Sequence, residues 1–576
     1  MNRPLLFILS AVVVNFAASA FVLFGFKSHL LTLLWIGSLG LWWLAYTKKT
    51  AASSLPRPSV SRVLLVIAAI CLPVLVRIAH FSADRLHDDA FITSYYSGTE
   101  NFLGKSFFSE IPDNKDWITE FPRLYFALQR IFFDLFGRSV TTINLSVQPY
   151  VLLLSAALFF SVRRLFGERT ALLTLLLYSF FSFSVYLERQ GLHFVSSTSL
   201  LMALFYLMVR CLQDRRRSDF ALAGIVCGLC YLFYISSYIA LPLFALFLAG
   251  YYVKFRHTAS WKEPAIGLGG FILVLLPFFA WALHTGTAYM RRINQVGLLN
   301  GEWSPAREAI EHGESAWTIV WNNTWLCLKS LVLDDVGGHG GYNFGYLSFF
   351  EPVGLGLFAI GLVAGLFLLR QKPILAISYL IVIGSFASGM ALTIAPPAFH
   401  RWSGALPFIA LFMALPMELL WKIPRIPQAA RYGIVAVLIL AFLISNERHV
   451  RRAIERDPVA GDLALGEYLN REFPGYHVHM AAYPGFAFEK IYYFVPHRST
   501  ADINTDYHGN YLSNFDRRTP YVYIIHAPKD GPPQDPTFED RFIHQDPLAK
   551  LVPFSNKYSL LIRGNSPAAA ENKTRP

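Results

Sequence analysis

The sequence predicts a polytopic α-helical membrane protein with a small C-terminal α/β domain, and three observations support this class. The 576 residues are 54% hydrophobic and only 15% charged, whereas a soluble globular chain carries about 25% charged residues. Apolar runs recur from the N-terminus to about residue 445, each close to the ~20 residues that cross a bilayer. The net charge of +12 comes mostly from short connectors between these runs, as the positive-inside rule predicts. This distribution argues against nucleic-acid binding.

The first apolar run, residues 5–26, follows Asn2-Arg3 and contains the small-residue stretch Ala17-Ala-Ser-Ala20, so it resembles a secretory signal. Apolar sequence resumes at once in residues 30–46, and we therefore favour a retained span. The connector that follows carries four Lys and Arg residues and a proline breaker, which places it in the cytoplasm. The third run, residues 63–81, then delivers the chain to the outer face.

Thirteen runs alternate with connectors whose charges agree with the positive-inside rule. The short connectors on the outer side offer only Lys27, Arg189 and Arg401. The N-terminus is therefore predicted inside and the C-terminal tail outside. The thirteen expected spans are residues 5–26, 30–46, 63–81, 146–162, 171–187, 194–211, 221–236, 238–253, 265–284, 353–369, 374–394, 402–420 and 431–445.

This topology divides the chain into three parts. Residues 1–62 hold two N-terminal spans and a cytoplasmic connector, residues 63–445 form the membrane core, and residues 446–576 form an extracytoplasmic domain with a disordered end. The tail carries a helix signature and patterns typical of strands, punctuated by Pro and Gly, without a catalytic signature. The elements expected there are a helix over residues 462–473 and strands over 477–481, 521–525 and 558–562.

Two long outer loops are expected, at residues 82–145 and 285–350. In the first, residues 121–137 alternate apolar stretches with polar side chains, which predicts a helix lying along the interface with its aromatic face in lipid, or else a short span. The second loop contains Asp334, Asp335 and His339 in a glycine-rich stretch. These three side chains would bind a metal or decorate a solvated loop, and we favour the loop.

The first outer loop begins with two adjacent acids, Asp88 and Asp89. A carboxylate close to lipid is costly and usually marks a substrate or ion site. The alternative is that the two acids mark the point where the chain leaves the membrane. Adjacent side chains diverge on a helix and on a strand, so we expect one acid to have the chemical role and the other to be a structural or metal-binding partner.

Four short motifs follow one another on the same predicted side of the membrane. Together they resemble the GT-C superfamily of integral-membrane glycosyltransferases, in particular the branch that uses polyprenyl-phosphate sugars and includes protein mannosyltransferases, aminoarabinose transferases and mycobacterial arabinosyltransferases. The likeness covers most of residues 63–445. The motifs are His87-Asp-Asp-Ala-Phe-Ile92, Phe121-Pro-Arg-Leu-Tyr125, Tyr186-Leu-Glu-Arg-Gln-Gly-Leu-His193 and Pro396-Pro-Ala-Phe-His-Arg-Trp402.

The sequence departs from the family pattern in two respects. Two spans precede the usual first helix, and the tryptophan-rich signature of oligosaccharyltransferase catalytic subunits is missing from the sequence. The second departure speaks against transfer of whole oligosaccharides to asparagine. The resemblance otherwise implies an inverting transfer of a sugar from a polyprenyl-phosphate donor to a lipid, glycan or protein hydroxyl, on the outer face of the membrane. We expect a bacterial inner membrane, because the outer part carries no disulfide pattern and the size suits that branch.

The residues present suit such a reaction. Phosphate is already a good leaving group, so one carboxylate that takes the proton of the acceptor hydroxyl is sufficient; we expect Asp88 to be this base and Asp89 its partner. The departing phosphate needs positive charge, which arginine supplies in a fixed fork. Whether a divalent cation (Mg or Mn) bridges acid and phosphate is left open.

The expected phosphate ligands lie at outer helix ends, where snorkelling and anchoring are the alternative roles. Outer basic residues are sparse in this sequence, and this favours function for the two arginines. The predicted ligands are Arg189, His193, His400 and Arg401, and the second-tier candidates in the first outer loop are Glu120 and Arg123.

Two other function classes remain open. A transporter or flippase for lipid-linked sugars would need ionisable residues or broken helices near the bilayer midplane, whereas the charges here gather at the ends of the spans. A non-catalytic scaffold whose outer domain binds a partner would tolerate substitution of the acidic pair.

Overall fold

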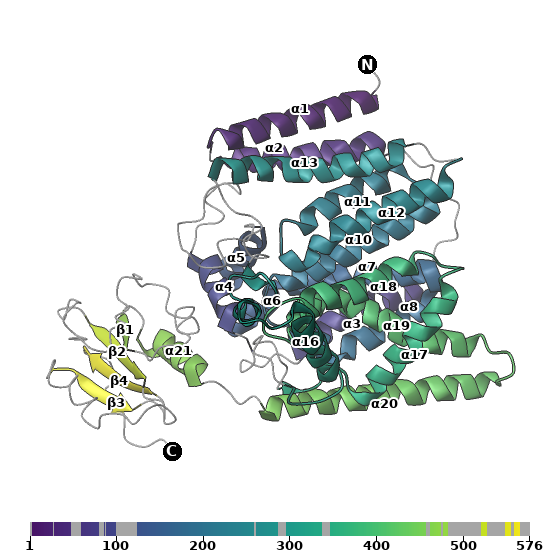
Figure 1. The fold of residues 1–576 in the computed structure, drawn as a ribbon. Helices are drawn as coiled ribbons and strands as arrows, with labels where there is room; N and C mark the ends of the chain where they lie inside the picture. The colour runs from purple at the N-terminus through teal and green to yellow at the C-terminus, as the bar shows by residue number, and fades with distance from the viewer. Residues whose placement is uncertain are drawn as a thin grey trace. The chain divides into compact units, whose positions relative to one another are not determined.

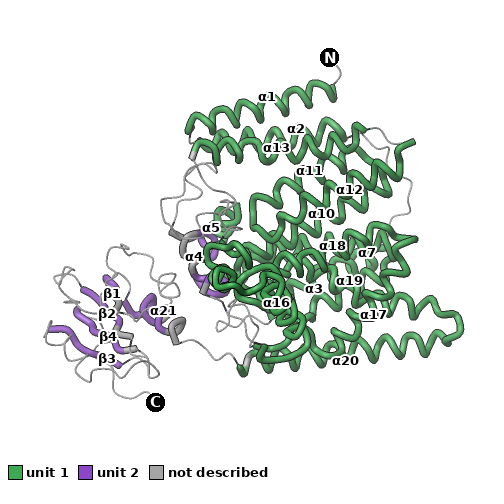
Figure 2. The backbone as a smooth tube through the Cα atoms, in the orientation of Figure 1, with its two compact units in different colours: residues 1–81, 101–132, 143–457 green, residues 82–100, 133–142, 458–576 purple. Residues whose placement is uncertain are grey.

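The computed structural model describes most of the chain, in two compact units that Figure 2 colours separately. We call residues 1–81, 101–132 and 143–457 the membrane unit, and residues 82–100, 133–142 and 458–576 the C-terminal unit. The described residues are 3–26, 28–47, 59–79, 86, 88–99, 124–257, 261–285, 295–336, 346–456, 461–473, 476–481, 520–526, 548–553 and 558–564.

The described residues between 3 and 456 are mostly helical (Figure 1). Within the described ranges, nine helical segments are long and apolar enough to cross a bilayer, and two shorter apolar ones accompany them. Apart from α4, the helices are α1 (Arg3–Leu23), α2 (His29–Tyr46), α3 (Val60–Ala79), α5 (Leu124–Phe136), α6 (Val140–Ser146), α7 (Gln148–Phe166), α8 (Glu168–Phe180), α9 (Ser182–Leu187), α10 (Phe194–Asp214), α11 (Arg217–Cys230), η3 (Ile235–Ile239), α12 (Ala240–Phe255), α13 (Lys262–Thr285), α15 (Pro305–Glu311), α16 (Ala316–Ser330), α17 (Pro352–Leu368), α18 (Leu375–Ser385), η5 (Phe386–Ala391), η6 (Phe399–Ala405), α19 (Leu406–Trp421) and α20 (Gln428–Arg456).

The described residues of the thirteen predicted spans are mostly helical, so the polytopic helical class is confirmed. Several spans differ in detail, and the one expected over residues 221–236 is interrupted at residues 231–234. The span expected over residues 171–187 is broken at Phe181, where the backbone is extended, and the amide of Ser182 is satisfied by Asn446 Oδ1 at 2.9 Å. A side chain from α20 thus replaces the lost helical partner. Helix α20 itself continues past residue 445 to Arg456.

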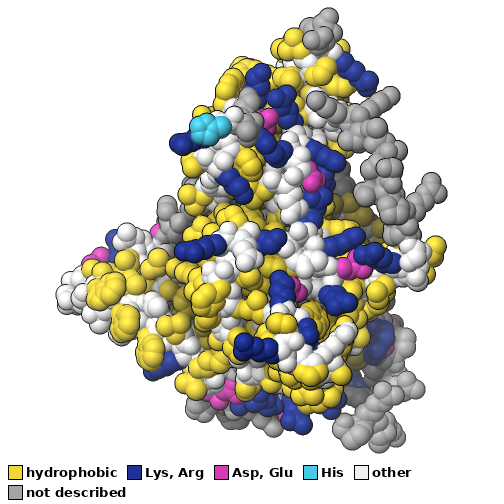
Figure 3. All heavy atoms as spheres, turned by 90° about the vertical axis from the view of Figure 1, so that its right-hand side faces the viewer, with side chains coloured by type: hydrophobic (Ala, Val, Ile, Leu, Met, Phe, Trp, Pro, Cys, Tyr) yellow, Lys and Arg dark blue, Asp and Glu magenta, His cyan; other side chains and the backbone are white. Residues whose placement is uncertain are grey.

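The connectors predicted to share one side of the membrane lie together at one end of the helices. Figure 3 shows many Lys and Arg side chains on this face. Because these connectors are far apart in sequence, their contacts support the predicted alternation of the spans. The ion pairs that join them are Arg62–Glu168 at 2.7 Å, Arg164–Asp214 at 2.9 Å and Arg217–Glu263 at 3.3 Å.

The first two helices pack against α13 (Figure 1). Pro277 in α13 has no N–H, so the carbonyl of Leu273, four residues earlier, loses its helical partner. Asn15 of α1 donates to this carbonyl at 2.8 Å and also to Ser38 of α2 at 2.8 Å. The proline in α13 therefore leaves a free carbonyl, and the hydrogen bond to this carbonyl attaches α1 to α13.

The C-terminal unit contains a four-stranded sheet in the order β1-β2-β4-β3, which confirms the predicted small α/β domain. The pair β1–β2 is parallel and the other pairs are antiparallel. Helix α21 (Gly461–Glu472) and the following Phe473 contribute buried apolar side chains to one core with the sheet. The strands are β1 (His477–Ala481), β2 (Tyr521–His526), β3 (Lys550–Pro553) and β4 (Tyr558–Arg563).

Strand β3 was not predicted from the sequence. It has four residues, ends in Pro553 and pairs only with β4 among the described strands. Proline is confined to such edge positions because it cannot donate to a neighbouring strand. A segment this short carries too little alternation to identify a strand.

Candidate functional site

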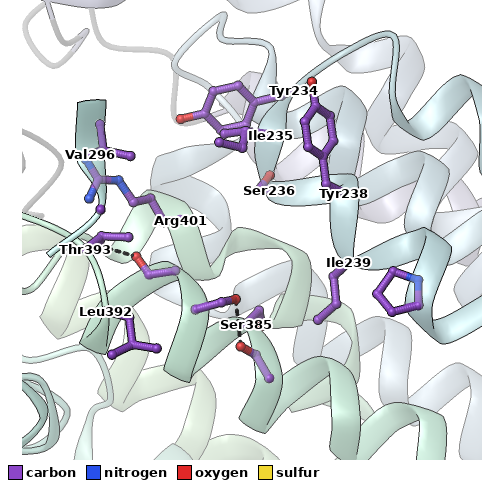
Figure 4. A pocket seen from close by; sticks show the side chains of 15 residues that line it. Tyr234, Ile235, Ser236, Tyr238, Ile239, Val296, Ser385, Leu392, Thr393 and Arg401 are labelled. Atoms are coloured by element: carbon purple, nitrogen blue, oxygen red, sulfur yellow. Dashed lines mark hydrogen bonds between the residues drawn. The ribbon is translucent and has the colours of Figure 1, made fainter. Parts of the chain in front are cut away.

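The membrane unit contains an apolar pocket of about 470 Å³. One wall comes from η3 and the start of α12, and the opposite wall comes from α18, η5 and the residues that follow (Figure 4). The lining residues are Tyr234, Ile235, Ser236, Tyr238, Ile239, Pro242, Val296, Gly297, Gly384, Ser385, Ser388, Gly389, Leu392, Thr393 and Arg401.

Arg401 is the one Lys or Arg among the described lining residues. It sits in η6, shortly after a cis peptide bond between Pro396 and Pro397, and its Nη1 donates to the carbonyl of Ile394 at 3.0 Å. A Cβ added to Gly389 would lie 2.6 Å from the Arg401 carbonyl oxygen, so η5 approaches η6 this closely only because it has glycine there. The half-buried guanidinium is thus held at the pocket by its own backbone surroundings.

The hydroxyl groups on the η5 wall bond to their own helix. Ser388 Oγ donates to Gly384 O at 2.8 Å, Thr393 Oγ1 donates to Gly389 O at 2.7 Å, and Ser385 Oγ donates to the carbonyl of Ile381. These side chains therefore present mainly carbon to the pocket. Segment η5 is a π-helix, an irregularity that occurs often at functional sites.

The opposite wall is aromatic. Tyr238 stacks on Tyr231 with ring centroids 4.5 Å apart, and the Tyr231 hydroxyl donates to the Tyr238 carbonyl at 2.9 Å. The ring of His193 lies 4.3 Å from the ring of Tyr234, between their centroids. His193 thus packs against a residue that lines the pocket, and its own side chain is buried.

The four predicted phosphate ligands are therefore placed differently. Arg401 lines the pocket, and His193 contacts the pocket wall through Tyr234. Arg189 and His400 are buried, at 6% exposure each, and do not line it. An apolar groove with one cation at its wall suits a lipid that carries one phosphate.

A buried ion pair holds the turn that carries Arg189. The Arg77 guanidinium in α3 is fully buried, and its Nε lies 2.7 Å from Glu188 Oε2. The Tyr178 hydroxyl donates to the other carboxylate oxygen, and Gln148 donates to the Glu188 carbonyl at 3.3 Å. The remaining Arg77 donors reach the carbonyls of Pro73, Ser179 and Tyr178 and the hydroxyl of Ser184.

Neither Glu188, which lies within one of the four motifs, nor Arg77, which lies within an apolar run, was predicted to have a role. A signal was present, because an arginine inside an apolar span rarely lacks a carboxylate or carbonyl partner. The sequence alone does not identify this carboxylate, because 111 positions separate Arg77 from Glu188.

Helix α5 also holds this turn, through hydrogen bonds to Gly191. The Tyr125 hydroxyl donates to the carbonyl of Gly191 at 2.5 Å, and Gln129 Nε2 donates to the same carbonyl at 3.2 Å. The prediction of a helix in residues 121–137 is confirmed, but the expectation that its aromatic face lies in lipid is wrong for Tyr125 and Phe126. Both are 1% exposed because they pack on protein.

The acidic pair begins helix α4 (Asp88–Thr99) in the C-terminal unit. Asp89 is half-buried. Two acids at the start of a helix also complement its dipole, which is a structural role for them. The side chain of Asp88 lies outside the described residues, as do Glu120 and Arg123, so their predicted roles stay predictions.

The acids of the second outer loop take part in ion pairs. Asp334 lies 3.6 Å from Arg452 and 3.7 Å from Arg456, and Asp335 lies 3.1 Å from Arg456. Partial burial pushes the pKa of Asp334 upward, but hydrogen bonds from Ser348 and the two arginines outweigh it, so the pKa lies below its ordinary value. His339 lies outside the described residues.

No group of three or more His, Cys, Asp or Glu side chains in the described ranges is arranged to hold a metal ion. The site as described therefore offers a guanidinium, apolar walls and aromatic rings. We assign no chemical step to a cation.

The fold is similar to that of solved structures. ArnT from Cupriavidus metallidurans, solved with undecaprenyl phosphate bound, aligns over 88% of this chain and 99% of its own, with a TM-score of 0.53 and 12% identity. The same protein in its apo state aligns over 87% and 98%, with a TM-score of 0.53 and 11% identity. The chain has the GT-C fold. The resemblance predicted from the four motifs is confirmed at the level of the fold.

Other comparisons are more limited. The sequence profile of the dolichyl-phosphate-mannose-protein mannosyltransferase family matches residues 121–284, a part of the GT-C core that includes Arg189 and His193 but neither Asp88 nor Arg401. The Archaeoglobus fulgidus oligosaccharyltransferase aligns over 75% of this chain and 63% of its own, with a TM-score of 0.48 and 12% identity. No curated protein matches the sequence significantly.

Proposed function

We propose that this protein is a membrane glycosyltransferase that moves a sugar from a polyprenyl-phosphate donor to a hydroxyl of a lipid, glycan or protein on the extracytoplasmic face of a bacterial inner membrane. The observation that carries the proposal is the pocket with Arg401 in a GT-C fold. An apolar groove accepts the first isoprenoid units, and a single guanidinium neutralises a single phosphate. The solved GT-C relative that carries undecaprenyl phosphate supports this choice of ligand.

In the proposed reaction, Asp88 takes the proton of the acceptor hydroxyl as the acceptor oxygen attacks the anomeric carbon of the sugar. The bond between that carbon and the phosphate oxygen breaks, and the phosphate leaves with the electron pair. Attack opposite the leaving group inverts the anomeric centre. Arg401 stabilises the charge that grows on the phosphate, which is the kind of interaction that lowers a barrier most.

The neighbouring groups have supporting roles in this proposal. Asp89 starts the same helix turn as Asp88 and orients it. Arg189 and His193 occupy the turn fixed by Glu188 and Tyr125, and we assign them to the donor head group. His400, next to Arg401 in η6, keeps that segment packed against Phe194, whose ring centroid is 6.2 Å from its own.

The test is sugar transfer by the purified protein in nanodiscs with polyprenyl-phosphate sugars. The Asp88→Asn variant is expected to lose transfer while it still binds the donor. The Arg401→Gln variant is expected to lose about 10²-fold in kcat/KM, and the matched Arg425→Gln variant, exposed in the connector before α20, is expected to keep full activity. Full transfer by Asp88→Asn would refute the assignment of the base.

The same preparation separates this proposal from a flippase. A transferase releases polyprenyl phosphate and makes a new glycosidic bond. Movement of intact donor between leaflets of proteoliposomes, without bond cleavage under any acceptor supplied, would overturn the enzyme proposal in favour of transport.

A further inference from the structure

Helix α16 turns a tryptophan face away from the protein. Trp317, Trp321 and Trp325 are 72%, 57% and 50% exposed, and Leu328 is 42% exposed. At about 100° per residue, these four positions fall within a stripe of about 80° on the helix surface. A contiguous aromatic surface of this kind marks an interaction site.

The other side of α16 faces the protein and is polar or small. Asn323, Cys327 and Ser330 are 7%, 0% and 2% exposed. Asn323 Nδ2 donates to the carbonyl of Ala391 at 2.5 Å and to that of Thr393 at 3.2 Å. Ala391 ends the apolar segment α18–η5, so α16 is attached at the end of a membrane helix.

The helix thus has the reverse of a soluble amphipathic pattern, since its polar side is buried and its aromatic side is exposed. A third stripe, Thr318, Asn322 and Lys329, is exposed beside the tryptophans. The Lys329 ammonium lies 5.6 Å from the Trp325 ring centroid, so it can interact with the aromatic ring while its charged end stays toward solvent.

The position of α16 identifies its partner. It lies in the connector between α13 and α17, both apolar, and it runs across the direction of α17 and α18 instead of alongside them (Figure 1). Tryptophan is enriched at the boundary between head groups and acyl chains. Val332 and Leu333, which follow the helix, are also exposed, at 47% and 53%, and extend the same apolar surface.

We propose that α16 is an interfacial membrane helix. Its tryptophan face enters the head-group region of the phospholipid leaflet next to the pocket, and the stripe of Thr318, Asn322 and Lys329 points toward the head groups and water. The contact with lipid is continuous with the lipid-facing surface of the spans.

This placement has a consequence for the pocket, which rests on the proposed function. Asn323 bonds to Thr393, and Thr393 lines the pocket. A lipid-anchored α16 therefore holds the η5 wall at the depth where a donor lipid carries its phosphate. Loss of the anchor should impair capture of long-chain donors more than the chemical step.

The test uses a fluorescent label at one introduced cysteine, in nanodiscs, with Cys71 replaced by serine because the other native cysteines are buried. Trp321→Cys carries an NBD group, and the matched control is Glu311→Cys in α15, where the side chain is 63% exposed. We expect blue-shifted emission at position 321 and quenching by lipids with a shallow doxyl group. We expect position 311 to be quenched by aqueous iodide.

Equal emission and equal iodide quenching at the two positions would overturn the proposal. Protection of position 321 by a soluble oligosaccharide, with no quenching by doxyl lipids, would also overturn it, because the tryptophans would then stack on sugar. Neither readout depends on activity, so a failure of the proposed function leaves this test intact.

A second measurement examines the link to the pocket. The triple variant W317Q/W321Q/W325Q is expected to raise KM severalfold for a long-chain donor in nanodiscs and to leave kcat for a short-chain donor unchanged. An unchanged KM for both donors would show that α16 does not contribute to donor capture.

Discussion

Arg77 illustrates how a residue that breaks the local pattern depends on a distant partner. A guanidinium inside a span is costly unless its charge and all its N–H groups are paired. Here the Glu188 carboxylate supplies the compensating negative charge, and carbonyl and hydroxyl oxygens from α3, α8 and α9 accept from the other N–H groups of Arg77. The pair therefore fixes the turn before α10, which contains Arg189, at one geometry.

We predict that Arg77→Gln destabilises the protein by about 3–5 kcal/mol, because it leaves the Glu188 carboxylate buried without its partner. Tyr178→Phe removes one hydrogen bond to the Glu188 carboxylate and should cost less, about 1.5–3 kcal/mol. The measurement is thermal unfolding in detergent. Arg62→Gln, which removes an exposed ion pair with Glu168, is the control and should change the unfolding temperature little. Equal shifts for Arg77→Gln and Arg62→Gln would contradict the prediction.

A second prediction at this scale concerns pH. Because the pKa of Asp334 is lower in the folded protein than its ordinary value, the folded state binds fewer protons, and the stability it supplies is present above the unfolded pKa of about 3.9. This stability should be lost as the pH falls below that value. Hydrogen exchange of residues 331–336 at pH 6 and pH 3 measures it. Asp334→Asn should remove the difference, and Asp335→Asn, at a 71% exposed side chain, should retain it.

Among the elements, the contact of α1 with α13 shows how a helix defect creates specificity. Pro277 frees one carbonyl in a segment where water is scarce, and Asn15 is the group that satisfies it. Within lipid, the hydrophobic effect does not drive two apolar helices together. Hydrogen bonds of this kind and close packing therefore determine which helices become neighbours. Trp35 of α2 adds a hydrogen bond to the next carbonyl, that of Val274, at 3.2 Å.

We predict that Asn15→Leu loosens this contact at a cost of about 1–2 kcal/mol. In a Pro277→Leu background the Leu273 carbonyl regains its helical N–H, so the same substitution should then cost much less. A double-mutant cycle by thermal unfolding checks this coupling. Additive effects of the two changes would show that the Asn15 hydrogen bond does not depend on the proline.

For the whole molecule, the alternation of basic and sparsely charged connectors predicts which ends of the helices lie on the same side of the membrane. The ion pairs among Arg62, Arg164, Arg217 and their partners gather the basic connectors at one end. A catalytic role for Arg401 requires it to lie at the opposite surface of the membrane, where the donor head group is expected.

Cysteine accessibility tests this arrangement. A cysteine at Arg370, exposed in a basic connector, should react with an impermeant maleimide only after the cells are opened. A cysteine at Glu302, exposed in the connector before α15, should react in spheroplasts. Reaction of both from the same side would refute the topology and, with it, the proposed outer site.

Much of the architecture was determined by the sequence alone. Apolar runs of bilayer length have few alternatives to a helix, since lipid offers no partner for free backbone groups, and the basic connectors predict the sidedness. The same local signals placed Arg401 and His193 at helix ends, and the alternating patterns of the tail predicted three of the four strands.

Which of these residues come into contact depends on the packing of the helices. The pairing of Arg77 with Glu188, the hydrogen bonds of Asn15 and Asn323 to carbonyls of other helices, and the position of His193 behind Tyr234 join residues far apart in the chain. Helix packing has no short-range pattern, because it depends on where breaks such as Pro277 and Phe181 leave backbone groups unsatisfied. For that reason the sequence located the helix ends, and the fold alone selected the side chains that form the pocket.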